Sequence, residues 1–491
     1  MSVERNLPVV RERKQAILSG DAALIAEQKK LGKLTARERV QALLDEGSFV
    51  EMDVLNADAG VVTGCGTVDG ATVYVYAQDF TVGGGAVGMK HAKKVLKLME
   101  LAQKTGNPIV AMLDSAGAKL EEGVAALDAY AQIAAKTTAL SGVVPQIALI
   151  LGPCGGTASV IAEISDITIQ SKAGELFVSG PLVVSAVSGK KVSMEDIAGV
   201  SASMKSGAAM LCAEDDAKAI ACARTIVKML PENNLDEAVF DFDDATDRPI
   251  NEFNELDKVE DVKAIVEKTV DSGSFVELYA EFASSMIVGL AKVGGRTVGV
   301  IANDPTKDDG RLTVYGCKKA AKLISFCDAF SIPVVTFVDS EGMKINSAPQ
   351  GELARAGAAL LYAMSETSAP KVALVLGNAI GMSYAATASK AVMDMVYAWP
   401  GAVISAVTTP IATQMLLGDE MTGSSDPIAK RAELEEKYAR DIADGVNAAK
   451  NGYVDDVIEP ADTRKVLWAA LEMLSAKRES AIAKKHGNLP L

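Results

Sequence analysis

The feature that most constrains the fold is an internal repeat at a spacing of 225 to 226 residues. The segment GSFVEM at 47–52 returns as GSFVEL at 273–278, and IALILGPCGG at 147–156 returns as VALVLGNAIG at 372–381. A spacing that stays constant over distant segments is the signature of duplicated structure. The chain is therefore predicted to be a tandem duplication in which each half is one structural unit.

Length and local charge indicate where the halves meet. The chain has 491 residues, and single cores stop growing at about 300 residues. Residues 232–261 hold twelve acids and two bases, as expected of an exposed connection. We expect an amino-terminal domain at 1–235, an acidic junction at 236–261 and a carboxy-terminal domain at 262–491.

Each half shows the pattern of a parallel sheet covered by helices. Continuous runs of Val, Ile and Leu alternate with helix-length segments, which is typical of strands buried on both faces. The predicted fold class is α/β. The elements expected in order are a β-hairpin (61–80; 287–302), a helix (90–104; 317–330), a buried strand (109–113; 334–338), a second helix, and a second buried strand (146–151; 372–376).

The ends of the buried strands carry the residues most suited to chemistry. Ligands of parallel sheets bind at the carboxyl ends of strands, where small residues allow close approach and helix starts present unpaired N–H groups. Two copies of a two-loop cradle favour oxyanion binding, with tight strand-to-helix turns as the alternative. The loops are Asp114–Gly117, Gly155–Thr157, Asp339–Gly342 and Gly381–Ser383.

Composition argues against several other functions. The net charge of −15 is unsuited to binding nucleic acid or an anionic membrane surface. The chain has only two histidines, His91 and His486, so neither a histidine-ligated metal site nor a Ser-His-Asp triad is predicted. Six cysteines without a CxxC pair, and an amino terminus without a signal peptide, predict the cytoplasm.

Several motifs follow one another along nearly the whole chain: GKLTARERV (32–40), DFTV (79–82), HAKKVLKLM (91–99), DSAGAKLEEGV (114–124), LGPCGG (151–156), FCDAFSIPVVTFVD (326–339), YAWPGA (397–402) and KKHGNLPL (484–491). In this set and order they resemble the biotin-dependent acyl-CoA carboxyltransferases. The branch they resemble most is that of the propionyl-CoA carboxylase β subunit and the methylmalonyl-CoA decarboxylase α subunit.

The resemblance implies two crotonase-like domains of the ββα-superhelix type, the first for acyl-CoA and the second for carboxybiotin. It implies active sites between domains of different subunits, in a hexamer built as a dimer of trimers. Coenzyme A thioester is then the substrate, and biotin arrives on a separate protein. The partner implied is a biotin carboxyl carrier protein, a biotin carboxylase subunit or a membrane decarboxylase subunit.

By position, the resemblance places one oxyanion hole in each half, at Gly156 and Thr157 and at Met382 and Ser383. The first would hold the enolate oxygen of the thioester and the second the ureido oxygen of biotin. Lys90, His91, Lys93 and Lys94 form a basic cluster at a predicted helix start and are candidates for binding the phosphates of coenzyme A, with a solvated helix face as the alternative. The remaining substrate-binding candidates are Ala116, Gly117, Gly155, Gly342, Gly381 and Ala385, of which Ala385 corresponds to a position that helps set acyl-chain preference.

Four loops depart from the family pattern. In the first half, the family's DSGGAR is replaced by DSAGAK at 114–119 and its GPCAGGA by GPCGGTA at 152–158. In the second half, the family's Asp-aliphatic-Pro-Gly-aromatic element is replaced by DSEGM at 339–343 and its GGAY by GMSY at 381–384. None of the changes introduces proline, so every backbone N–H survives. Met382 adds a side chain where glycine leaves space, and Glu341 adds a carboxylate near the biotin end. A biotin-independent crotonase-type hydratase or isomerase and a non-catalytic scaffold are therefore the alternatives.

Other polar residues admit two interpretations. Lys33, Arg37 and Arg39 are candidates for contacts with coenzyme A or with another subunit, with surface ion pairing as the alternative. Cys154 is expected to be a buried structural thiol, because no basic residue adjoins it. Of the adjacent Glu121 and Glu122, at most one is expected to face a ligand.

Overall fold

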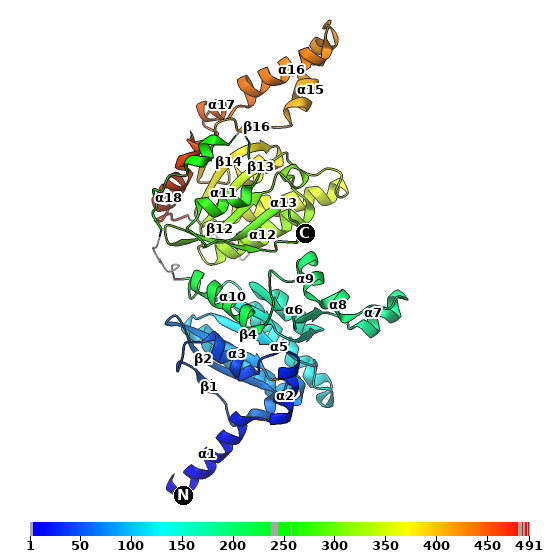
Figure 1. Ribbon diagram of the computed structural model, residues 1–491, viewed down its shortest axis with the longest axis vertical. Coiled ribbons are helices and arrows are strands. Elements are labelled where there is room, and N and C mark those ends of the chain that lie inside the picture. The colour runs from blue at the N-terminus through cyan, green and yellow to red at the C-terminus, as the bar shows by residue number, and fades with distance from the viewer. Residues whose placement is uncertain are drawn as a thin grey trace. The chain divides into compact units, whose positions relative to one another are not determined.

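The computed structural model describes residues 3–236, 244–256 and 258–479, together with residues 484, 487, 488 and 490. The chain forms two compact units, Met1–Glu237 and Ala238–Leu491, here called unit 1 and unit 2 (Figure 1). Parts of the predicted junction and of the carboxy-terminal motif lie outside the described residues.

Unit 1 is built on a seven-stranded sheet in the order β1-β2-β3-β4-β5-β7-β9. The first three strands pair antiparallel, and the pairs from β3 to β9 are parallel. Two short strands, β6 and β8, form a separate parallel pair. The bounds are β1 (Val50–Met52), β2 (Val61–Val68), β3 (Ala71–Gln78), β4 (Ile109–Leu113), β5 (Gln146–Ile150), β6 (Pro153–Gly155), β7 (Ile167–Ser171), β8 (Glu175–Phe177) and β9 (Leu211–Ala213).

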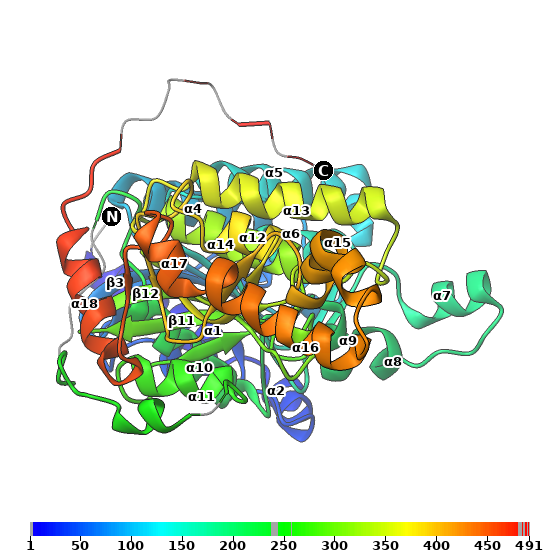
Figure 2. The ribbon, with the colours of Figure 1, turned by 90° about the horizontal axis from the view of Figure 1, so that it is seen from above.

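Helices cover both faces of this sheet, which is why β4 and β5 are buried along their whole length. Helices α4 (Met89–Thr105) and α5 (Val124–Leu140) share one apolar cluster with alternate residues of β3 and β4. Helices α3 (Ala36–Leu43) and α10 (Asp216–Met229) pack together and contact other residues of the sheet. Figure 2 shows α4 and α5 on one side of β3 and α10 on the other.

The remaining helices of unit 1 are α1 (Val3–Ser19), α2 (Ala22–Lys30), α6 (Thr157–Ile164), α7 (Pro181–Ser188), α8 (Met194–Ala198) and α9 (Val200–Ser206). Helix α1 buries no residue, and α7 extends away from the sheet of its unit (Figure 1). Leu182 and Val187 of α7 are 87% and 85% exposed. Among the described helices, none is both long enough and apolar enough to cross a bilayer.

Unit 2 repeats this plan in a sheet of order β10-β11-β12-β13-β14-β15-β17, with β16 paired to β14. Helices α11 and α18 share an apolar cluster with the sheet, while α12 and α13 pack against each other. The bounds are β10 (Val276–Leu278), β11 (Met286–Val293), β12 (Arg296–Asn303), β13 (Val334–Ser340), β14 (Lys371–Ile380), β15 (Met395–Ala398), β16 (Val403–Ser405), β17 (Asp456–Val457), α11 (Val262–Thr269), α12 (Val314–Ala329), α13 (Gln350–Glu366), α14 (Met382–Thr387), α15 (Thr409–Thr422), α16 (Pro427–Tyr438), α17 (Gly445–Lys450) and α18 (Thr463–Met473).

The predicted repeat is confirmed in register. In the hairpins Val61 pairs with Gln78 and Met286 with Asn303, so both strands keep the spacing of 225. The predicted α/β class, the two hairpins and the four buried strands are confirmed. Helix α12 begins three residues earlier than expected, because Thr313 accepts a hydrogen bond from the Gly316 N–H at 3.0 Å and caps it.

An arginine ties the last helix of each unit to its hairpin. In unit 2 the fully buried Arg464 contacts Asp271 at 2.7 Å and donates to the Thr269 carbonyl at 2.9 Å. Asp271 also accepts from the hairpin N–H groups of Gly294 and Gly295. In unit 1 Arg224 contacts Asp45 in the same way at 3.0 Å, but its side chain is 25% exposed.

The difference in burial predicts unequal effects of one substitution. Arg464→Met leaves the Asp271 carboxylate with its charge unpaired, which costs about 3–5 kcal/mol of unfolding free energy. Arg224→Met removes partly exposed ion pairs with Asp45 and Asp69 and is expected to cost less, about 1 kcal/mol. Urea unfolding of both variants measures the difference, and equal losses would contradict the buried pairing.

Candidate functional site

The first cradle, residues 155–158, lies where β6 leads into α6. Gly156 caps this helix with φ +61° and ψ −130°, a conformation that residues with a Cβ rarely adopt. Its own N–H donates to the Phe177 carbonyl at 3.0 Å and is therefore engaged. The first N–H groups of a helix have no acceptor within it. Thr157 and Ala158 thus supply the donors of this cradle, and Gly156 supplies the turn that places them.

The second cradle, residues 380–383, has the same backbone design in unit 2. Gly381 caps α14 with φ +54° and ψ −115°. Its N–H donates to the Ser405 carbonyl of β16 at 2.8 Å, as Gly156 does to β8. The donors at this helix start are therefore the N–H groups of Met382 and Ser383.

The side chains of the second cradle pack into unit 2. A Cβ built on Gly357 of α13 would lie 3.3 Å from the Met382 Cε, so this glycine leaves room for the thioether. Ser383 is fully buried, and its hydroxyl donates to the Ile380 carbonyl at 2.9 Å. The Met382 side chain was expected from the sequence to occupy space that glycine leaves to a ligand. Part of this side chain instead lies in the space left by Gly357 of the neighbouring helix.

The loops 114–117 and 339–342, which flank the two cradles, are closed by hydrogen bonds within their own unit. These bonds engage the N–H groups of Ala116, Gly117 and Gly342, so the residues shape the loops and do not donate to a substrate from the backbone. The same two bonds occur in each unit: Ala116 N–H to Gly84 O (2.8 Å) and Gly117 N–H to Ser115 Oγ (3.1 Å), and Glu341 N–H to Asp309 O (3.3 Å) and Gly342 N–H to Ser340 Oγ (3.2 Å).

Two predicted positions lie beside the cradles. A Cβ on Gly155 would come within 2.5 Å of the Phe177 ring, so glycine there makes room for this ring. Ala385 is half-buried on the first turn of α14. Its N–H donates to the Gly381 carbonyl at 3.1 Å, so it belongs to the helix that the second cradle begins.

Asp114, at the end of β4, is held by two buried cations. Lys33 contacts one carboxylate oxygen at 2.7 Å and Arg39 the other at 2.8 Å. Arg39 also contacts Asp216 at 2.8 Å and donates to the Leu151 carbonyl at 2.9 Å. Because these side chains are at most 5% exposed, the network is internal. Lys33 and Arg39 therefore join α3, β4 and α10, which corrects the expectation that they contact coenzyme A or another subunit.

The comparisons with known proteins agree with this geometry. Residues 27–489 match the carboxyl transferase domain family. The chain belongs to this family. It is 37% identical to the carboxyltransferase subunit of propionyl-CoA carboxylase from Haloferax mediterranei, covering 100% of both chains. It is 38% identical to the methylmalonyl-CoA decarboxylase subunit alpha from Propionigenium modestum, covering 98% of both.

A solved relative shows the fold directly. The crystal structure of the transcarboxylase 12S subunit, described as a hexamer assembly with methylmalonyl-coenzyme A bound, matches with a TM-score of 0.95 at 38% identity. The match covers 100% of this chain and 99% of that one. The resemblance found in the motifs and the crotonase-like fold class are thereby confirmed.

The expected basic cluster at the start of α4 is only partly at the surface. Lys93 is exposed, but His91 is 2% exposed and Lys94 3% exposed. Lys94 donates to the Val61 carbonyl at 2.8 Å. Burial lowers the pKa of His91 to about 4, so the ring is neutral at pH 7. A buried neutral ring does not meet phosphates, which corrects the expectation for His91.

The buried His91 ring has no partner of normal hydrogen-bond geometry among the described side chains and backbone, and neither does the Tyr130 hydroxyl. Both residues line a cavity of about 10 Å³ next to Ala158 of the first cradle. This is about the volume that one water molecule requires. One ordered water would satisfy both residues.

The state of His91 predicts a dependence of stability on pH. The folded pKa of about 4 lies below the unfolded value of about 6.5. Stability is therefore complete above pH 6.5 and declines by up to about 3 kcal/mol as the pH falls towards 4. Urea unfolding of the protein and of His91→Gln measures this, and an equal decline in both would contradict a buried neutral ring.

A pocket of about 370 Å³ opens beside the second cradle. Gly381, Tyr384 and Ser405 line it on the cradle side, with Asn447 and Tyr453 opposite. The walls combine phenol and amide groups with apolar side chains such as Ile404 and Ile442. Such a lining suits a neutral ring system that carries hydrogen-bonding groups.

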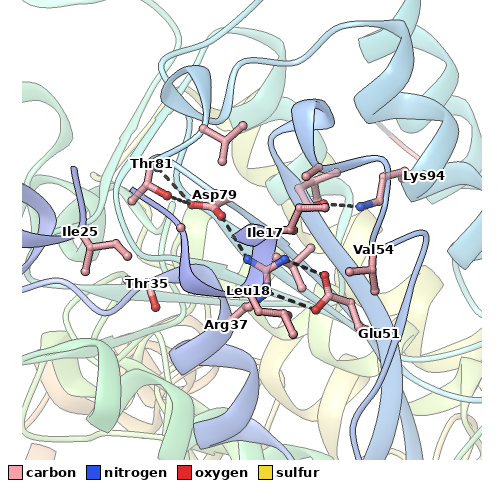
Figure 3. Close-up of a pocket in the computed structure, with 15 residues that line it drawn as sticks. Ile17, Leu18, Ile25, Thr35, Arg37, Glu51, Val54, Asp79, Thr81 and Lys94 are labelled. Atoms are coloured by element: carbon pink, nitrogen blue, oxygen red, sulfur yellow. Dashed lines mark hydrogen bonds and ion pairs between the residues drawn. The ribbon is translucent and has the colours of Figure 1, made fainter. Parts of the chain in front are cut away.

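A smaller cavity of about 70 Å³ lies beneath α1 and α2 in unit 1 (Figure 3). Arg37 makes two contacts with Glu51, at 2.8 and 3.2 Å, and lies 3.9 Å from Asp79. Lys94 also lines the cavity. The positive charges of Arg37 and Lys94 there offset the negative charges of Glu51 and Asp79. Arg37 of the GKLTARERV motif is thus an internal partner as well, although its side chain is 22% exposed.

The remaining candidates have structural roles. Burial raises the pKa of Cys154 to about 12, so the thiol stays protonated, as the sequence predicted for a structural cysteine. Glu122 accepts from the Met89 N–H at 2.7 Å and caps α4. Sequence reasoning missed the partners of Lys33 and Arg39, because Asp114 lies 81 and 75 residues away from them.

Proposed function

We propose that the chain is the carboxyltransferase subunit that moves a carboxyl group between biotin on a separate carrier protein and a short-chain acyl-CoA. The observation that carries the proposal is the pair of cradles with one backbone design, at equivalent places in two repeated units. The relatives act on propionyl-CoA and methylmalonyl-CoA by their names, and the same class of substrate is proposed here.

In unit 1 the proposed substrate is the thioester. The N–H groups of Thr157 and Ala158 would bind its carbonyl oxygen as the α-carbon loses a proton or a carboxyl group, because negative charge then gathers on that oxygen. One such donor contributes roughly 2.7–4 kcal/mol to a transition state.

Two further residues are proposed to contact the substrate. Ala385 of unit 2 is the proposed position for acyl-chain preference, and Lys93 of unit 1 is the proposed contact for the phosphates of coenzyme A.

In unit 2 the proposed ligand is the ureido ring of biotin. The pocket beside the second cradle suits it, because Tyr384, Ser405 and Asn447 provide polar groups among apolar walls, and because Gly381, which begins α14, also lines it. When bound, carboxybiotin supplies the carboxyl group and a basic nitrogen. The chain's own contribution is to hold the ureido oxygen at the helix start, where developing negative charge is favoured.

The same chemistry serves carboxylation and decarboxylation, so the partner sets the direction. A biotin carboxyl carrier protein, a biotin carboxylase subunit and a membrane decarboxylase subunit are the partners that suit it. A homo-hexamer is proposed as well, supported by the hexamer described for the 12S subunit. Exposed apolar residues of α7 and α15 suit such contacts: Leu182, Val187, Met415 and Leu416. The cytoplasm is proposed as the compartment, supported by six cysteines without a CxxC pair.

The proposal predicts decarboxylation that depends on biotin. Incubation of the pure protein with methylmalonyl-CoA and free biotin is expected to yield propionyl-CoA, with little turnover when biotin is omitted. Liquid chromatography of the thioesters measures this. Hydration of an enoyl-CoA without biotin would favour a crotonase-type hydratase instead, and inactivity without binding of coenzyme A thioesters would favour a scaffold.

The first cradle is tested by a matched pair of glycine substitutions. Gly156→Ala forces a Cβ onto a backbone with positive φ and is expected to lower kcat about 100-fold, because the donors that follow it lose alignment. The exposed Gly123 caps α5 with a similar backbone, φ +54° and ψ −126°, and has nothing within 4 Å of a built Cβ. Gly123→Ala therefore carries similar strain, and an equal fall in kcat for both variants would refute the role of the cradle.

A further inference from the structure

Asp339 occupies in unit 2 the place that Asp114 occupies in unit 1. Each residue lies at the carboxyl end of a buried parallel strand, β4 or β13, and each lies against a glycine: Gly152 just after β5, or Gly377 within β14. A Cβ built on Gly152 would be 1.9 Å from the Asp114 carboxylate, and one built on Gly377 would be 2.6 Å from the Asp339 carboxylate. The two aspartates are therefore structurally equivalent.

The two carboxylates are neutralised differently. The cations of Asp114 come from the segment around the start of α3, which Thr35 caps. Asp261 caps α11 of unit 2, and counting from these caps the counterpart of Arg39 is Ile265 and that of Lys33 is Val259. Among the described residues, no cation lies within ion-pair distance of Asp339. Unit 2 thus has the equivalent aspartate, Asp339, but neither of the two cations that pair with Asp114.

One oxygen of Asp339 is left for a ligand. The residue is 7% exposed. Its Oδ1 accepts from the Asn378 backbone N–H at 2.8 Å and from the Asn378 side-chain amide at 3.3 Å. Neither of these bonds reaches Oδ2. Burial raises the pKa of the Asp339 carboxyl above its ordinary value, and Asn378 offsets only part of this effect.

The counterpart of Lys33 lies at an open pocket in unit 2, whereas Ile265, the counterpart of Arg39, is buried in the apolar core. A pocket of about 1000 Å³ lies over the carboxyl ends of β13 and β14. Asp339 and Asn378 line it, together with Val259, the counterpart of Lys33. Five carboxylates and one lysine are its charged lining residues, and the lysine, Lys258, is paired with Glu260 at 3.1 Å.

We infer that this pocket binds a guanidinium or primary ammonium group on the free oxygen of Asp339. The group takes the place of the lysine and arginine that unit 1 supplies from its own chain. It belongs either to a small molecule or to an arginine or lysine side chain of a partner protein. The inference does not depend on the proposed function, because neither of the two helix starts, residues 155–158 and 380–383, lines this pocket.

Calorimetric titration of the intact protein with agmatine tests the inference. Agmatine carries both cationic groups on a short chain, and saturable binding is expected. Asp339→Asn keeps the shape and the Asn378 contacts but removes the charge, so binding is expected to weaken about 10- to 100-fold. Glu459→Gln, on the wall of the same pocket, is the matched control and is expected to stay within about twofold.

Val259→Lys provides a second test that does not rely on the folding of Asp339→Asn. It restores the cation that Lys33 provides in unit 1 and is expected to abolish binding of agmatine by occupying Asp339. The neutral isostere butylurea is expected not to bind. Absence of saturable binding, equal weakening in Asp339→Asn and Glu459→Gln, or equal binding of butylurea would overturn the inference.

The source of the group is distinguished by the same titration with the peptides acetyl-Gly-Arg-Gly-amide and acetyl-Gly-Lys-Gly-amide. Tighter binding of either peptide than of agmatine assigns the site to a side chain of a partner protein. Weaker binding of both peptides assigns it to a small molecule.

Discussion

The candidate site depends on one backbone constraint, the positive φ of the glycine that begins α6 and α14. At Gly156 and Gly381 the chain leaves a strand, turns through a conformation that a Cβ disfavours, and enters a helix at once. A carbonyl of a second strand holds the glycine N–H in each unit. The next N–H groups therefore open the helix without intrahelical partners, in the position where negative oxygen is stabilised. Backbone geometry accounts for the proposed chemistry without a histidine or a metal.

Duplication explains why the two units share this device and where they differ. Both keep the closed flanking loops and the arginine that ties the last helix to the hairpin. They differ at the strand end: Asp114 is enclosed with Lys33 and Arg39, while Asp339 faces an open pocket. They differ also at the cradle, where Met382 packs against Gly357 of the neighbouring helix. The surroundings of Asp114 are therefore filled by cations of the same unit, and those of Asp339 are open.

The sequence predicts the elements well, because a constant spacing and buried apolar runs are local signals. It also predicts the glycine turns before α6 and α14, because small residues after a buried strand are typical of such turns. It does not predict which polar residues are internal. Arg39 meets Asp114 across 75 residues of chain, and His91 is buried although exposed Lys93 lies two residues away. The sequence also does not predict where the Met382 side chain packs, because it lies against Gly357 of another helix and no motif marks this glycine.

The central claim is that the start of α6 polarises the thioester carbonyl and the start of α14 does not. Isotope-edited infrared spectroscopy of propionyl-CoA labelled with ¹³C at this carbonyl measures it directly on the bound substrate. The account predicts a lower stretching frequency on binding, which Gly381→Ala retains and Gly156→Ala loses. An unchanged frequency on binding, or a shift that Gly381→Ala loses and Gly156→Ala retains, would contradict it.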